Sequence, residues 1–289
     1  MTLFFNVILT NNIVMNVVEN DRLILVPCDF SPLAYHAMGH GAYMSKAMNS
    51  RLLILHVAPR EDDVLAMEKK LHFVAEECFE KFGIRPEVMI RQGSQPYSSI
   101  KTVTKELKPM LVILKTGGGV HTVTMLSGTS TPFLVIQGPP MSSVVNHISF
   151  PINFLNQHEE KLKRVIHFSD YYPDAVMHII TPSGKGTPKE RIISANLTLM
   201  ANIMEKQGVK TNFITHDKIK NTAETILELS KGMDMIVIQI EEASSLHRFF
   251  FGLREEKLII NVDKIPVLCF NLETDLKNEN QGRDYTAHG

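Results

Sequence analysis

The chain of 289 residues contains one sequence pattern twice, and this internal repeat constrains the fold more than any single motif. Four pairs of corresponding residues lie 123 to 125 positions apart: Pro27 and Pro151, Pro59 and Pro182, Gly83 and Gly208, and Leu111 and Met235. The last pair, Pro132 and Pro266, lies 134 positions apart. The first copy is therefore ten residues shorter just before its final apolar run.

Within each copy, apolar runs alternate with stretches of helical spacing. In the first copy the runs predict strands at 22–27, 51–59, 85–93, 110–116 and 132–137. Helices are expected between them, one beginning at Ser31 and Pro32 and a charged one ending at Gly83. Strands that alternate with helices form parallel βαβ units. The prediction is an α/β protein of two tandem doubly wound, mostly parallel five-stranded sheets flanked by helices.

The repeat also sets the expected domain boundaries. The two domains should span residues 22–140 and 141–272, and the polar residues 273–289 should form a disordered tail. Residues 1–21 are an N-terminal extension with no basic residue before Arg22, unlike a signal peptide, and too short for a confident membrane span. Two explanations of this extension are open. It forms an edge strand or an arm, or translation begins at Met15, and we favour the second explanation.

Charge and cysteine content exclude several classes of function. The 30 basic and 31 acidic residues give a net charge of −1, so we expect neither nucleic acid nor a membrane as a partner. Cys28, Cys78 and Cys269 make an odd, sparse set without Cys-x-x-Cys spacing. They are expected to be buried thiols in a reducing cytoplasm, without a disulfide or a zinc site.

The sequence contains little that indicates catalysis or metal binding. His36 and His40 lie four positions apart on the first helix, but no third ligand accompanies them, so no metal is predicted. Ser31 lies beside Asp29 without a convincing histidine base, and a role in capping the helix explains it better. We therefore expect that the protein is not an enzyme.

Glycines follow the fourth predicted strand, where a ligand would lie. Ligands of doubly wound sheets bind beyond the carboxyl ends of the strands, at the point where strand order reverses. The loop Val26-Pro-Cys-Asp-Phe-Ser31 and the loop Lys115-Thr-Gly-Gly-Gly-Val120 both belong to that end. Backbone N–H groups of consecutive glycines can approach a phosphate closely.

Both halves, roughly residues 22–272, resemble the universal stress protein family in its tandem two-domain form. The resemblance rests on the segments at 24–57, 107–119 and 132–137. It implies a five-stranded sheet and, in some members, bound ATP. Carried over by position, Pro27 and Asp29 match the element that contacts the nucleoside, and His56 and Val57 match the residues that line the base pocket.

The phosphate-binding segment of the family, Gly-x-x-Gly-(x)9-Gly-Ser/Thr, can be aligned in two ways. One places it on Lys115, Gly118, Gly128 and Thr129, but leaves no room for the last helix before Pro132. The other reads residues 119–132 as that helix, with Gly119 and Val120 in place of Gly-Ser and most of the loop deleted. The ten-residue shortening favours the second alignment. Backbone donors of Gly117, Gly118 and Gly119 would then meet one phosphate at most.

The second half departs further from the family pattern. Asn153 stands where Asp29 stands, Glu242 and Leu253 replace motif residues, and Gly252 remains. Acidic side chains would repel phosphate, so no ATP is expected in this half. The resemblance also implies that the two fifth strands pair within the chain, and further homodimerisation of the whole chain is left open.

These observations lead to two functional hypotheses for a cytoplasmic protein. The first is a stress-response regulatory protein of universal stress type, with a degenerate nucleotide site, that acts through an unknown protein partner and needs no cofactor. The alternative is binding of ATP or another adenine nucleotide in the first domain. The candidate nucleotide-binding residues are Pro27, Asp29, His56, Val57, Gly117, Gly118, Gly119 and Val120.

Overall fold

The computed structural model describes residues 7–8, 22–116, 131–139, 144–152, 158–217, 222–240 and 256–271. The first half contributes strands β1 (Val7–Ile8), β2 (Leu23–Pro27), β3 (Arg51–Ala58), β4 (Glu87–Gln92), β5 (Leu111–Lys115) and β6 (Phe133–Ile136). The second half contributes β7 (His147–Pro151), β8 (Val176–Pro182), β9 (Thr211–His216), β10 (Met235–Ile240) and β11 (Val267–Asn271).

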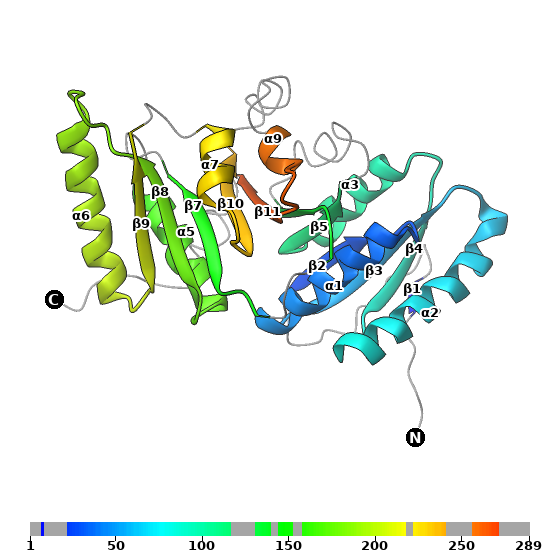
Figure 1. Cartoon of the computed structure of the whole chain (residues 1–289). Helices are drawn as coiled ribbons and strands as arrows, with labels where there is room; N and C mark the ends of the chain where they lie inside the picture. The colour runs from blue at the N-terminus through cyan, green and yellow to red at the C-terminus, as the bar shows by residue number, and fades with distance from the viewer. Residues whose placement is uncertain are drawn as a thin grey trace.

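All of these strands belong to a single sheet of eleven strands, ordered β1-β4-β3-β2-β5-β6-β11-β10-β7-β8-β9 (Figure 1). Five strands of each half follow the same doubly wound order, as the repeat predicted, and β1 is an additional edge strand of the first half. The α/β fold class is confirmed. The two sheets are continuous, because β6 pairs with β11. That pairing is antiparallel, and every other pairing between described neighbours is parallel.

Helices cover the two faces of the sheet in two sets. One apolar layer contains residues of α1 (Pro32–Ala47), α2 (Val64–Phe82), α5 (His158–Tyr171) and α6 (Glu190–Lys206). The other contains residues of α3 (Pro96–Leu107), α7 (Ala223–Leu229) and α9 (Glu256–Ile259). The strands β2, β3, β5 and β6 are almost continuously buried, as parallel strands covered on both faces must be, whereas the edge strand β9 is partly exposed.

Local sequence signals mark the beginning of α1 and the C-terminal end of α2. The Ser31 hydroxyl accepts a hydrogen bond from the Ala34 N–H at 3.3 Å, with Pro32 as the first helical residue. The short 3₁₀ turn η1 (Glu61–Asp63) leads into α2, which ends at Gly83. Gly83 has φ +72°, the left-handed conformation expected of a helix C-cap.

The N-terminal extension supplies an edge strand. Val7 and Ile8 form β1 and pair in parallel with Val88 and Met89 of β4. This pairing agrees with the edge-strand alternative for the extension. Met15 and the predicted tail at 273–289 lie outside the described residues.

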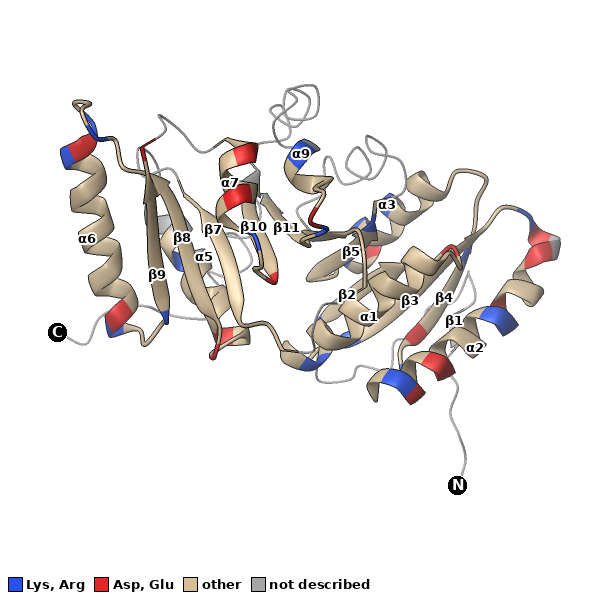
Figure 2. Ribbon diagram, viewed as in Figure 1, with Lys and Arg blue, Asp and Glu red and all other residues tan. Residues whose placement is uncertain are grey.

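Charged residues lie mainly on the helices, and the sheet is largely uncharged. Figure 2 shows acidic and basic residues following one another along α2, whereas those of α6 lie at its two ends. Among the described segments, no helix is both long enough and apolar enough to cross a membrane.

Candidate functional site

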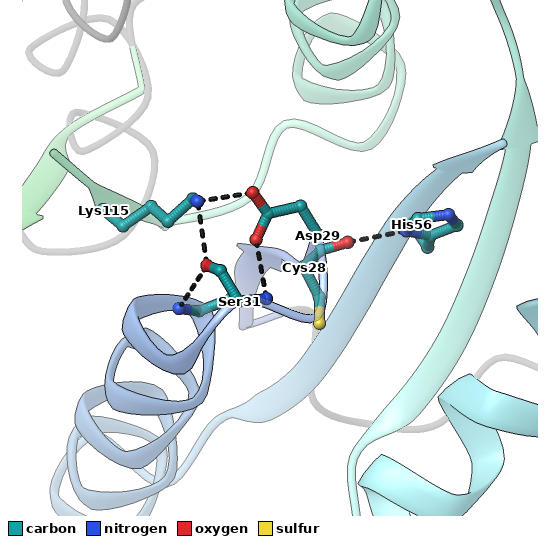
Figure 3. A network of polar contacts seen from close by, with 6 residues as sticks. Cys28, Asp29, Ser31, His56 and Lys115 are labelled. Atoms are coloured by element: carbon teal, nitrogen blue, oxygen red, sulfur yellow. Dashed lines mark hydrogen bonds and ion pairs between the residues drawn. The ribbon is translucent and has the colours of Figure 1, made fainter. Parts of the chain in front are cut away.

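A polar cluster lies beyond the carboxyl ends of three neighbouring strands of the first half. Asp29 follows β2, His56 lies near the end of β3, and Lys115 is the last residue of β5. Because β2 pairs with both β3 and β5, the three strand ends are adjacent. Figure 3 shows their side chains, with those of Cys28 and Ser31, around the beginning of α1.

Lys115 joins Asp29 to the beginning of α1. Its ammonium group donates to the Asp29 carboxylate and, at 2.9 Å, to the Ser31 hydroxyl (Figure 3). The Ser31 backbone N–H donates to the other Asp29 oxygen at 3.1 Å. Both carboxylate oxygens of Asp29 and the capping hydroxyl of Ser31 therefore already accept hydrogen bonds within the protein.

These contacts determine the charge state of Asp29. Partial burial raises the pKa of the carboxyl group, but the hydrogen bonds from Lys115 and Ser31 outweigh burial and hold the pKa below its ordinary value. The Asp29 side chain is 56% exposed and that of Lys115 is 25% exposed. The site is thus a neutralised, water-accessible ion pair.

His56 is buried beneath the turn that follows β2. Its Nδ1 donates to the Cys28 carbonyl oxygen at 2.7 Å, which ties the end of β3 to the residue before Asp29. The Phe30 ring lies against the His56 ring with centroids 4.5 Å apart, and the Lys70 ammonium lies 4.2 Å from the Phe30 centroid. Burial raises the pKa of the Cys28 thiol, so this group is neutral at physiological pH.

Phe30 has an uncommon backbone conformation. Its φ is +61°, a left-handed value that is costly for a bulky side chain. The bond from the Ser31 N–H to Asp29 closes this turn, and the stacking of Phe30 on His56 holds it. The strained residue therefore places the aromatic ring over His56 and positions Asp29 toward Lys115.

The structure places the other predicted residues as follows. Pro27 is the last residue of β2 and pairs with Leu55. Val57 belongs to the apolar layer on the α3 side, because successive strand residues point to opposite faces. The remaining candidates lie outside the described residues: Gly117, Gly118, Gly119 and Val120, and in the second half Asn153, Glu242, Gly252 and Leu253.

The histidine pair of α1 faces the protein interior. His36 Nδ1 and His40 Nε2 are buried and have no hydrogen-bond partner among the described residues. Burial is the main cause that lowers the pKa of His40 to about 4, so its ring is neutral at physiological pH. The described ranges contain no group of three or more His, Cys, Asp or Glu side chains that could hold a metal ion.

Two residues of this site were not predicted from the sequence. Lys115 entered the sequence analysis only as a replaced motif glycine in the less favoured alignment, although it is the cation that pairs with Asp29. Its charge at the end of a strand adjacent to β2 was the available signal. Phe30 was not singled out within the loop after the first strand, although its position between Asp29 and a capped helix indicated a tight turn.

Comparisons with known proteins establish the fold. Comparison with family models and with curated protein sequences gave no match. Among solved structures, a universal stress protein from Archaeoglobus fulgidus DSM 4304 superposes with a TM-score of 0.70 at 16% identity, covering 89% of this chain and 98% of that one. A protein of unknown function from Pseudomonas aeruginosa PAO1 superposes with a TM-score of 0.60 at 14% identity, covering 90% and 96%.

The class of protein follows from these matches and from the strand order. The chain has the α/β fold of the universal stress proteins. It has this fold in tandem form, with two copies in one chain joined through β6 and β11.

Proposed function

We propose that this protein is a stress-response regulatory protein of universal stress type that acts through protein contacts and does not depend on ATP. The observation that carries the proposal is the engagement of Asp29 by Lys115. In the ATP-binding members of the family that the sequence resembles, the residue at this position contacts the nucleoside. Here its oxygens already accept bonds from Lys115 and Ser31.

Ribose hydroxyls would compete with the Lys115 ammonium group and the Ser31 N–H for the Asp29 oxygens. The ion pair is exposed, so its net stability is modest, about 1 kcal/mol or less. Its replacement by a hydroxyl would nevertheless exchange an ion pair for a hydrogen bond from an uncharged donor. Phe30, stacked on His56, also covers a residue that the family resemblance assigns to the base pocket.

The middle of α6 supports a role in protein contacts. Ile192 and Leu199 are 53% and 58% exposed, and their seven-residue spacing places them on one face of the helix. Charged residues of α6 lie at its ends and not between these two side chains (Figure 2). Exposed apolar side chains on one helix face can contribute to a surface that binds another protein.

The thiols support a location in the reducing cytoplasm. Cys28, Cys78 and Cys269 are all free and buried. Oxidising compartments favour disulfides in exported proteins, whereas isolated buried thiols are common in reducing ones.

A nucleotide titration tests the proposal. ATP is added to the purified full chain, and binding is followed by calorimetry and by the melting temperature. We expect no heat of binding and no thermal shift at millimolar ATP for the natural protein. Binding with a Kd one hundred times below the ATP concentration would stabilise the protein by about 2.7 kcal/mol, a readily visible shift. Stoichiometric binding that is lost in Asp29→Ala would refute the proposal.

Binding of an adenine nucleotide in the first half is the second candidate function. It is favoured by the position of Lys115, whose ammonium group lies at the carboxyl ends of the strands, where it would also attract phosphate. In that case Lys115→Met should weaken ATP binding, because a cation is removed from the site. If Lys115 instead competes with ribose for Asp29, Lys115→Met should bind ATP more tightly than the natural protein.

A further inference from the structure

Two histidine rings of the second half face each other on the α7 side of the sheet. His147 Nδ1, at the beginning of β7, lies 3.0 Å from His178 Nε2 in β8. The ring centroids are 5.2 Å apart. Asn212 of β9 pairs with His178 in the sheet, and its amide nitrogen lies 3.1 Å from the second ring nitrogen, Nδ1. Three adjacent strands therefore contribute one row of nitrogen-bearing side chains.

The first half of the chain is apolar at the matching positions. His147 is the first residue of β7 and corresponds to Leu23, the first residue of β2. In the sheet register His178 pairs with Ser149, as Leu53 pairs with Leu25 in the first half, so His178 corresponds to Leu53. These leucines are 6% and 2% exposed and belong to the layer beneath α3. His147 is exposed and His178 is half-buried, so the second half has opened this position to water and filled it with imidazoles.

Two neighbouring imidazole rings are well suited to bind a metal ion. Zinc and related ions bind histidine nitrogen at about 2.0–2.1 Å, so two ligands at 90–109° lie about 2.9 to 3.4 Å apart. The observed separation of 3.0 Å is within this range. A metal ion can replace the proton that the rings share, after small ring rotations.

The surroundings of the pair can hold both rings in place. A ligating histidine usually donates its other N–H to an oxygen acceptor, and the Asn212 amide lies at that nitrogen of His178. Its oxygen and nitrogen can exchange places by rotation, so the amide can accept this proton. An Asp234 carboxylate oxygen accepts from the backbone N–H groups of Asn146 and His147 at 2.8 and 2.9 Å, which fixes the beginning of β7.

We propose that His147 and His178 form an open two-histidine site for a divalent ion of intermediate softness, namely Cu²⁺, Ni²⁺ or Zn²⁺. Asn212 is a positioning residue that orients the ring of His178. No third His, Cys, Asp or Glu ligand joins the pair within the described segments, so water or an external ligand completes the coordination. The site does not involve Asp29 or Lys115 and goes beyond the function proposed above.

Calorimetric titration of the untagged, chelator-treated full chain with copper, nickel and zinc chlorides at neutral pH tests this site. We expect one ion per chain at His147 and His178, bound most tightly for Cu²⁺, as the general affinity order of divalent ions requires. His147→Gln and His178→Gln should each weaken binding by at least about tenfold, and Asn212→Leu by about tenfold. His72→Gln, which removes a histidine of α2 in the other half, is the matched control and should bind like the natural protein.

Two further measurements keep the test decisive. Circular dichroism reports whether each variant is folded, and His147→Gln, at an exposed strand start, serves alone if His178→Gln unfolds. In NMR spectra, one equivalent of Zn²⁺ should shift the ring signals that disappear in His147→Gln. The proposal is overturned if the natural protein binds none of the three ions at millimolar concentration, or if His147→Gln binds them as tightly as the natural protein.

Discussion

The junction between the two halves is expected to depend on one pair of leucines. Leu134 of β6 and Leu268 of β11 lie directly opposite each other in the antiparallel pair and are 0% and 1% exposed. Both belong to the apolar layer beneath α1 and α5. Replacing either with alanine removes side-chain contacts from the only described strand pairing that joins the halves.

The magnitude follows from the burial of these residues. Leucine to alanine removes three buried carbon atoms, worth about 2.4 kcal/mol of transfer free energy. The cavity left behind raises the expected loss of unfolding free energy to about 2–5 kcal/mol for each single variant. Because opposite side chains share one space, the two losses should not add, and the coupling should be about 0.5–3 kcal/mol.

A double-mutant cycle measured by urea unfolding tests this expectation. Unfolding is followed by far-UV circular dichroism for Leu134→Ala, Leu268→Ala and the double variant. The control cycle pairs Leu134 with Ile54, which is equally buried on β3, three strands away at about 14 Å. The control should be additive to within about 0.5 kcal/mol. Additivity in the Leu134–Leu268 cycle would refute direct packing across the junction, and valine replacements serve if the double alanine variant does not fold.

Three further predictions concern the beginning and the middle of α1 and the site beside it. Ser31→Ala removes the helix cap and should lower the unfolding free energy by about 1 kcal/mol, measured by urea unfolding. Gly41→Ala should lower the urea concentration at the midpoint of unfolding, although alanine has the better helix propensity. The new Cβ would lie 2.8 Å from Val26 Cγ2, and overpacking of this kind costs about 1–3 kcal/mol. A raised midpoint would contradict this packing. Lys115→Met should raise the pKa of Asp29, read by carboxyl NMR, and destabilise the protein at neutral pH by less than about 1 kcal/mol. Because Lys115 lowers this pKa, the difference in stability should disappear as the pH falls through the pKa of Asp29 in the folded protein, and a difference that persists at low pH would argue against the ion pair.

Sequence patterns predicted the elements well because the relevant signals are local. A hydroxyl and a proline at Ser31 and Pro32 marked the beginning of α1, and Gly83 marked the end of α2. The 124-residue offset then transferred the same assignment to the second half. The local patterns could not show that the halves share one continuous sheet, because that depends on β6 and β11 meeting edge to edge, a pairing that only the family resemblance implied.

The polar sites were predicted less completely because they depend on contacts distant in sequence. Asp29 was identified from its position after the first strand, but its partner Lys115 lies 86 residues away. His147 and His178 lie 31 residues apart and meet through the register of β7 and β8. Such pairs become visible only when strand order and register are both known.

The antiparallel junction determines how the two sites are arranged. Strand direction reverses between β6 and β11, so the carboxyl edge of the first half continues as the amino edge of the second. The Asp29 cluster follows the end of β2 and His147 begins β7, so both lie along the same edge. Five strand spacings separate β2 from β7, about 24 Å, which is beyond direct contact. Substitutions at Lys115 should therefore leave metal binding unchanged, and substitutions at His147 should leave the response to ATP unchanged.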